Sequence, residues 1–384
     1  MKKLLLCSAA VVGMTMASAP AMAQVDLTVG GHTKNYVGWL DQDTSSAANT
    51  DERNFDILRE SELHINAEAT ADNGLTYGFH LELEVDGGDA ANIPEESYLY
   101  LASDLGRVNI GSEDGAAYLL QVAAPSADSN IDGIRQYIQP VNYAIASTVA
   151  AVNTYLGTTV NTPDGFDYDN DLTGQAGGAD EKLTYLSPIW NGFQFGVSYT
   201  PDAGDAASAS GREGFNRDDV NNAYGEAYEG AVRYEGQFNN VGFAVGGGYT
   251  HVELENEVAG GALDDMKEWN VGLDLDIGAF GVGAVYTENN NGTDVGDEDD
   301  TIVVGVDYTT GPFKLGASYY NKDDENGLAA GQYDTKRYTG GVIYTAAPGL
   351  SFRGSISFID HDVPAAIGSD VEATSVLGGI QFNF

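Results

Sequence analysis

Histidine is the side chain best suited to bind a transition metal or to move a proton near neutral pH. The chain has five histidines, and no two of them stand at the spacing of a metal-binding motif: His32, His64, His80, His251 and His361. The sequence also lacks a nucleophile elbow, and its one cysteine, Cys7, lies in a segment that we expect to be removed. These residues therefore give no indication of an enzyme.

Carboxylates are far more numerous, with 58 Asp and Glu against 17 Lys and Arg. Asp167, Asp169 and Asp171 repeat at every second residue, which resembles the spacing of ligands in some calcium-binding loops. Leu172 and Gly178 stand where such a loop needs a glycine and a bidentate glutamate. The three aspartates are therefore weak candidates for binding Ca²⁺, the one cofactor that the sequence leaves open. We interpret them instead as carboxylates that are exposed to solvent.

Two further acidic runs, 297–300 and 323–325, fall in expected outer loops. Divalent cations could bridge such loops to anionic lipopolysaccharide. Nucleic acid is excluded as a partner, because its phosphates would repel a chain with a formal net charge of −41.

The elements that must position these side chains are short strands with one apolar face. Apolar residues alternate with small or polar ones in 192–200, and residues 269–277 alternate an unbroken apolar face with one that includes Asp274 and Asp276. The pattern recurs at 241–250, 280–287, 302–309, 313–320, 338–344 and 350–359. An acidic face behind an apolar face is hard to reconcile with a soluble β-sandwich, whose two sheets must cover each other.

Short and long connections alternate between these strands. Short turns are expected at 71–74, 103–106, 190–192, 236–240, 278–279, 310–312 and 346–349. Longer polar connections are expected at 41–53, 86–94, 113–180, 201–223, 255–266, 288–299, 323–332 and 362–371. Fifteen connections make sixteen strands, with both ends of the chain on the short-turn side. The sequence therefore predicts an all-β fold, a sixteen-stranded antiparallel transmembrane β-barrel.

Aromatic residues gather near the ends of the expected strands, as they do at the two surfaces of a membrane. Tyrosine is also a good strand former, so the positions carry weight as a set rather than singly. The set before long loops and before short turns is Tyr199, Tyr249, Tyr286, Tyr319 and Phe358, then Tyr308 and Tyr344.

Both ends of the chain indicate export. Lys2 and Lys3 precede an apolar stretch, and small residues follow it, so we expect residues 1–23 to be a signal peptide that is cleaved after Ala23. The mature barrel would then span 24–384 without cysteine, and no disulfide would stabilise it. We expect residues 372–384 to form the closing strand and to pair with residues 25–40.

A barrel of sixteen strands is too wide to be filled by its own side chains, so an aqueous lumen is expected. The connection at 113–180 is 68 residues long, and a loop of that length in a compact domain is usually functional. We expect this third loop to fold into the barrel and to form a constriction.

Several stretches carry a resemblance to a known family: GSEDGAAYLLQVAAPSA (111–127), FDYDND (166–171), EKLTYLSP (181–188), NGFQFGVSYTPD (191–202) and the terminal IQFNF. Over nearly all of the mature sequence, the chain resembles general diffusion porins of the alphaproteobacterial type. The resemblance implies a homotrimer in the outer membrane that passes ions and small hydrophilic solutes through a lumen narrowed by the third loop. It also implies that Phe382 and Phe384 form the signal that the barrel-assembly machinery reads.

The resemblance places the acidic side of the constriction in the third loop, at Glu113, Asp114, Asp128, Asp132, Asp164, Asp167, Asp169 and Asp171. Strand alternation offers basic residues for the opposite side: Arg107, Arg233, Lys314 and Arg353. Porins of this type commonly carry an arginine where this chain has Ser112, and basic residues where it has Glu62 and His64. The basic half of the constriction is therefore expected to be depleted.

Removal of Lys2 and Lys3 from the 17 basic residues leaves 15 against 58 acidic ones, a formal net charge of −43. A low-dielectric wall around an acidic lumen concentrates cations and repels anions. The sequence therefore predicts a cation-preferring porin. A substrate-specific outer-membrane channel and a non-conducting structural or adhesive barrel remain as alternatives.

Overall fold

The structure is a computed structural model, and the described part of the chain excludes the first 24 residues and parts of several loops. The described residues are 25–44, 53–85, 94–127, 131–132, 134–136, 138–141, 154–155, 158–159, 170, 172, 180–203, 220–257, 263–292, 298–326, 331–362 and 370–384. The expected signal peptide, 1–23, lies outside the described residues.

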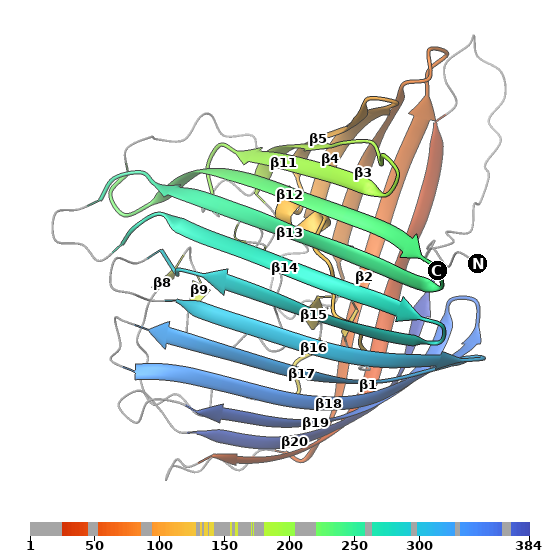
Figure 1. The fold of residues 1–384 in the computed structure, drawn as a ribbon, viewed down its shortest axis with the longest axis vertical. Helices are drawn as coiled ribbons and strands as arrows, with labels where there is room; N and C mark the ends of the chain where they lie inside the picture. The colour runs from red at the N-terminus through yellow and green to blue at the C-terminus, as the bar shows by residue number, and fades with distance from the viewer. Residues whose placement is uncertain are drawn as a thin grey trace.

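Sixteen antiparallel strands form one closed barrel, as predicted. Figure 1 shows it from the side, with β12–β19 toward the viewer and β2–β4 in the far wall. In barrel order the strands are β1 (Asp26–Thr44), β2 (Phe55–Thr70), β3 (Thr76–Glu84), β4 (Pro94–Ser103), β5 (Gly106–Ser112), β10 (Glu181–Leu186), β11 (Phe193–Thr200), β12 (Tyr224–Phe238), β13 (Val241–Leu254), β14 (Met266–Ile277), β15 (Phe280–Asn289), β16 (Asp299–Thr310), β17 (Phe313–Asn326), β18 (Gly331–Ala347), β19 (Leu350–Asp362) and β20 (Val371–Asn383). Between β5 and β10 lie α1 (Ala116–Leu119) and the short strands β6 (Ile131–Asp132), β7 (Arg135–Gln136), β8 (Thr154–Tyr155) and β9 (Thr158–Thr159).

The barrel closes where the last strand meets the first. β20 pairs with β1 from Thr44 opposite Val371 to His32 opposite Asn383, which confirms the predicted pairing of the two end strands. Beyond the ladder, Phe384 and Gly31 exchange two backbone hydrogen bonds, Phe384 N to Gly31 O at 3.0 Å and Gly31 N to Phe384 O at 3.1 Å. The terminal residue is therefore held to the first strand.

The fifteen connections join the strands in the predicted order, and the third loop spans 113–180 as predicted. Several strands run further than expected. β17 continues to Asn326, so the acidic run 323–325 lies in a strand rather than in a loop, and Asp299 and Asp300 open β16. Asp299 stands opposite Asp324 and Asp300 opposite Asp323 across β16 and β17, and Lys322 forms an ion pair with Asp299 (3.1 Å). The cation offsets the like charges that the extended ladder brings together.

The two faces of the wall differ in polarity as the alternation predicts. In β14, Trp269, Val271 and Leu273 point outward and are exposed, whereas Asn270 and Glu268 point inward and are buried. The outward aromatic residues pack across strands near both ends of the barrel, for example Tyr199 on Tyr228, Trp269 on Tyr286, Phe280 on Tyr308 and Phe313 on Tyr344, with ring centroids 4.7–5.4 Å apart. They form the two belts expected of rings that prefer a membrane interface. Among the described residues, no helix is long and apolar enough to span a bilayer.

The first part of the third loop lies inside the barrel. Residues 113–127 follow the inner wall from β11 to β17, and α1 lies behind β12 and β13 in Figure 1. Ala117 contacts the wall at Gly248, Val122 at Gly272, Pro125 at Gly305 and Ala127 at Gly316, always on backbone that carries no side chain. We call this row of wall glycines the glycine track: Gly196, Gly246, Gly248, Gly272, Gly283, Gly305 and Gly316.

Apolar clusters hold the loop along its path. Ala124 and Ile134 pack with Val285, Val303 and Tyr320 of the wall. Further along, Ile138 packs on Tyr36 and Leu377, and Val141 packs on Ile359, Val371 and Ala373, so the loop reaches β19, β20 and β1. The expected inward fold of the third loop is therefore seen in its described residues.

Deleting Phe384 should impair assembly of the barrel more than it changes conduction. The deletion removes two backbone hydrogen bonds at the closing seam, together on the order of 2 kcal/mol, and one ring of the belt at the short-turn end. A lower yield of folded barrel, scored by heat-modifiable migration on a gel, is the expected result. Phe384→Tyr, which keeps the backbone and the ring, is the control; equal yields from the deletion and the control would contradict the assignment.

Gly305→Ala should push the third loop off the wall of β16. A Cβ at this position would lie 1.9 Å from the carbonyl oxygen of Pro125. Overpacking of this kind costs about 1–3 kcal/mol, and the loop can yield only toward the lumen, so thermal stability and single-channel conductance should both fall. Gly340→Ala is the matched control, since a Cβ there meets nothing within 4 Å. Equal conductance in the two variants would show that the loop does not depend on the glycine track.

Candidate functional site in the barrel lumen

The base of the third loop is fixed by a buried carboxyl group. Glu113, the first residue after β5, accepts a hydrogen bond at Oε2 from Asn109 Nδ2 (2.6 Å), and its carbonyl oxygen accepts one from Lys182 Nζ. Burial raises the pKa of Glu113 to about 7, because a charged carboxylate loses its hydration there. The loop therefore starts from a carboxyl group that changes charge near neutral pH.

Wall side chains hold the backbone of the loop. The N–H of Ala116 donates to Ser198 Oγ (2.9 Å), and the N–H of Ala117 donates to Glu229 Oε2 (3.1 Å). Arg233 Nη1 donates to the carbonyl oxygen of Gln121 (2.7 Å). Glu229 and Arg233 thus act as anchors from β12.

A later part of the loop contacts both its first segment and the wall at β13. The N–H of Asn170 donates to Gln121 Oε1 (2.9 Å), and its Oδ1 accepts a hydrogen bond from Thr250 of β13 (2.6 Å). Leu172 packs against Tyr224 and Met266 in a buried cluster. The described loop residues are therefore attached to the wall in two segments, an early one around Ala116 and Gln121 and a later one at Asn170 and Leu172.

The structure places the four predicted basic residues on the inner face, in different settings. Arg233 donates to the carbonyl oxygen of Gln121 in the loop, and it also pairs with Glu235 (2.8 Å). Arg107 lies over the ring of Tyr100, 4.1 Å from its centroid, two residues after the turn at 104–105. Lys314 pairs with Asp307 (2.8 Å) near the turn at 311–312, and Arg353 donates to Ser351 Oγ (3.1 Å). Whether any of them borders the narrowest level stays a prediction.

The predicted acidic residues of the loop can be placed only in part. Glu113 and Asp114 are described, and the N–H of Asp114 donates to Glu96 Oε1 (3.1 Å) of β4. Asp132 is described only as a backbone position of β6. The others lie outside the described residues: Asp128, Asp164, Asp167, Asp169 and Asp171. The weak calcium candidates thus stay untested predictions.

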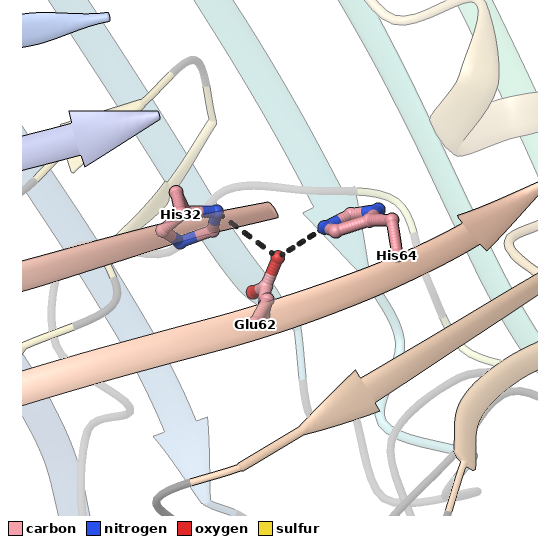
Figure 2. A group of neighbouring side chains, drawn as sticks. All are labelled: His32, Glu62 and His64. Atoms are coloured by element: carbon pink, nitrogen blue, oxygen red, sulfur yellow. Dashed lines mark hydrogen bonds and ion pairs between the residues drawn. The ribbon is translucent and has the colours of Figure 1, made fainter. Parts of the chain in front are cut away.

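A row of histidines and carboxylates lines the inner wall of β1–β4. His32 stands directly opposite Glu62, and His64 stands opposite Glu82. His80 completes the row, with its Nε2 3.4 Å from Glu82 Oε2 and 3.5 Å from Glu96 Oε2. Figure 2 shows the first part of it, with the Glu62 carboxylate between the rings of His32 and His64. We call these residues the histidine–glutamate row: His32, Glu62, His64, His80, Glu82 and Glu96.

Spacing along the chain was the wrong measure for these histidines. His32, His64 and His80 match no metal motif in sequence, yet the antiparallel register makes them neighbours, with ring centroids 6.4 and 5.7 Å apart. The signal that could have found them is alternation, since all three occupy inner positions on consecutive strands. Glu62 and His64 lie on the same inner face, with Glu62 Oε2 3.2 Å from His64 Nε2.

Lysines of the wall occur beside acids. Lys34 pairs with Glu60 (3.2 Å), Lys314 with Asp307 (2.8 Å) and Lys322 with Asp299 (3.1 Å). Asp274 and Asp276 add carboxylates to the same inner face. These pairs offset the charges of the three lysines, and the inner face carries further carboxylates in the histidine–glutamate row and in β14.

The predicted assembly signal lies on the outer face. Phe382 and Phe384 are both exposed, and their rings stack with centroids 5.8 Å apart at the end of the barrel that carries the short turns. In Figure 1 the C-terminus lies at this end. Recognition of these rings by the assembly machinery stays a prediction.

Comparisons with known proteins agree with this architecture. The chain is similar in fold to an anion-selective porin from Comamonas acidovorans, with 15% identity, a TM-score of 0.60, and coverage of 94% of this chain and 100% of that one. It is similarly close to a porin refined at 1.8 Å resolution (18% identity, TM-score 0.59, 94% and 100% coverage) and to OmpT of Vibrio cholerae (14% identity, TM-score 0.58, 95% and 99% coverage). A comparison with curated protein sequences finds no match.

At these identities, the similarity to the solved structures shows a shared fold and carries no argument about ion preference or assembly. The family comparison goes further, because the model for Gram-negative porins matches residues 8–363, which is most of the chain. That match agrees with the closed sixteen-stranded barrel and with the loop inside it. The chain belongs to the Gram-negative porin family, whose barrels lie in the outer membrane.

Proposed function

We propose that this porin is a cation-preferring channel for the passive diffusion of ions and small hydrophilic solutes. The observation that supports it most is the lumen wall, where Lys34, Lys314 and Lys322 each pair with a carboxylate while further carboxylates stay on the same face. Surplus negative charge on a low-dielectric wall attracts cations. The third loop narrows the lumen, which brings passing ions closer to these charges.

The further parts of the proposal concern assembly and location. A homotrimer is supported by family membership and by one fold relative, OmpT of Vibrio cholerae, for which a trimer form is described (13% identity, TM-score 0.57). Export through a signal peptide cleaved after Ala23, recognition of Phe382 and Phe384 by the assembly machinery, and contact with lipopolysaccharide complete it. Its function is conduction rather than catalysis.

Cation preference should appear as the sign of the reversal potential across a salt gradient in planar bilayers. The permeability ratio should favour cations and should weaken as salt rises, because the Debye length shrinks from about 10 Å at 0.1 M to about 3 Å at 1 M. Asp276→Asn, which removes one charge from the inner face, should lower the ratio. Glu372→Gln removes the same charge from the outer face of β20 and should leave it unchanged.

Three other results of this recording would each contradict the proposal. Anion preference would contradict the assigned sign. Saturable block by one sugar or amino acid would indicate a substrate-specific channel, and the absence of discrete ohmic steps would indicate a structural or adhesive barrel.

The raised pKa of Glu113 predicts a pH-dependent stability. Its pKa rises from an ordinary value of 4.5 to about 7, so the folded state favours the neutral carboxyl group. The contribution to the free energy of unfolding should therefore be full below about pH 4.5 and be lost as the pH rises to about 7, by about 3 kcal/mol.

Glu113→Gln keeps an oxygen that can accept the hydrogen bond of Asn109 but cannot ionise. Its thermal unfolding temperature in detergent should fall less between about pH 5 and pH 8 than that of the unchanged protein. Glu372→Gln, at an exposed position on the outer face of β20, is the control and should follow the unchanged protein. Parallel curves for all three proteins would contradict a role for Glu113.

A further inference from the structure

The histidine–glutamate row contains a set of side chains with the chemistry of a transition-metal site. Glu62 Oε2 lies 3.4 Å from His32 Nδ1 and 3.2 Å from His64 Nε2. Figure 2 shows how one carboxylate oxygen faces a nitrogen of each ring. The candidate ligand atoms of these three residues all lie within 4.8 Å of one another. Three donors from two adjacent strands therefore converge on one place.

These separations fit a tetrahedral zinc ion. Zinc binds imidazole nitrogen and carboxylate oxygen at about 2.0–2.2 Å, so neighbouring ligand atoms of a tetrahedral site lie about 3.3–3.5 Å apart. Both measured distances from Glu62 to the histidines are close to this spacing. We propose that His32, Glu62 and His64 bind a zinc-like divalent transition metal on the inner wall of the barrel.

The second nitrogen of each ring supports this assignment. His32 Nε2 lies 2.7 Å from Glu60 Oε2, and His64 Nδ1 lies 3.1 Å from Glu82 Oε2. A metal-binding histidine usually donates its other N–H to a carboxylate or carbonyl, which fixes the ring and its tautomer. Both histidines have this outer partner in place, although Glu60 also serves Lys34 (3.2 Å).

The donor types select the class of metal. Two imidazoles and one carboxylate suit zinc and its neighbours in the first transition row, whereas Ca²⁺ and Mg²⁺ prefer a shell of oxygen atoms. The side chains of His32 and His64 are 15% and 26% exposed, so the lumen reaches the site and water can supply a fourth ligand. Binding would add two positive charges to a wall that attracts cations, and would lower cation flow reversibly. The site thus goes beyond the proposed channel function by adding a means of regulating it.

A neighbouring set competes for the same histidine. His64, His80 and Glu82 also converge, but this set would use His64 Nδ1, and His80 Nδ1 is already 2.7 Å from Asn66 Oδ1. In the first set, the outer partner of both histidines is a carboxylate, Glu60 or Glu82. In the second set, the outer partner of His80 is the neutral amide oxygen of Asn66. The geometry therefore favours His32, Glu62 and His64, and the two assignments can be separated by substitution.

The test is metal binding to the purified mature protein, residues 24–384, in detergent, so that the thiol of Cys7 is absent. Zn²⁺ is titrated by calorimetry in a background of about 5 mM Mg²⁺, which blocks sites that are made only of carboxylate oxygens. The expected result is one saturable equivalent per chain, which His32→Gln, His64→Gln and Glu62→Gln each abolish. Glu60→Gln should weaken binding by about 10–100-fold, as loss of an outer partner does. His80→Gln should keep the equivalent, and so should the control His251→Gln, whose ring faces one carboxylate at 3.8 Å.

Cobalt supplies a readout that does not depend on variants, in case one fails to fold. Co²⁺ bound at this site should give the visible absorption bands of a tetrahedral ion, and Zn²⁺ should displace it. Absence of both a saturable Zn²⁺ equivalent and tetrahedral Co²⁺ bands would overturn the site. Loss of binding in His80→Gln with retention in His32→Gln would overturn the assignment of ligands. Neither measurement requires a conducting channel, so failure of the proposed ion preference would leave this test unaffected.

Discussion

The structure depends on one constraint: in lipid, every backbone N–H and C=O of a spanning strand must find a partner within the protein. A flat sheet would leave two edges unpaired, so the sheet closes, and β20 pairs with β1 along most of their length. Closure then divides each strand into residues that face lipid and residues that face the lumen. The polarity of the two faces, the aromatic belts and the charged inner wall all follow from that division.

The sequence predicts what has a period and misses what depends on register. Alternation with period two predicts the strands, the order of the connections and the inward side chains such as Asp274 and Asp276. Alternation does not mark the ends of strands, because a polar residue such as Asp323 continues a ladder as readily as it begins a loop. The sequence does not predict which side chains are neighbours on adjacent strands. His32 contacts Glu62 because the register pairs two residues that are thirty positions apart.

The loop shows the same limit. Its length and its inward path were expected, but its attachments come from isolated contacts that have no pattern along the chain. Arg233 is expected opposite the acids of the loop, but its hydrogen bond to the carbonyl oxygen of Gln121 has no signal in the sequence. Glu229 receives the N–H of Ala117, and Asn170 links the later loop to Thr250. Each contact depends on where two distant segments meet in three dimensions, which a single sequence does not encode in any local signal.

The glycine track has a consequence for how such a channel can change over evolutionary time. Where Pro125 and Ala127 lie on Gly305 and Gly316, the barrel contributes backbone alone, and the surface met by a passing ion belongs to the loop. Substitutions in this short segment can therefore alter the calibre and lining of the passage while the strands keep their register. The barrel strands and this segment of the loop can therefore evolve separately, and the loop can diverge in sequence without destabilising the barrel.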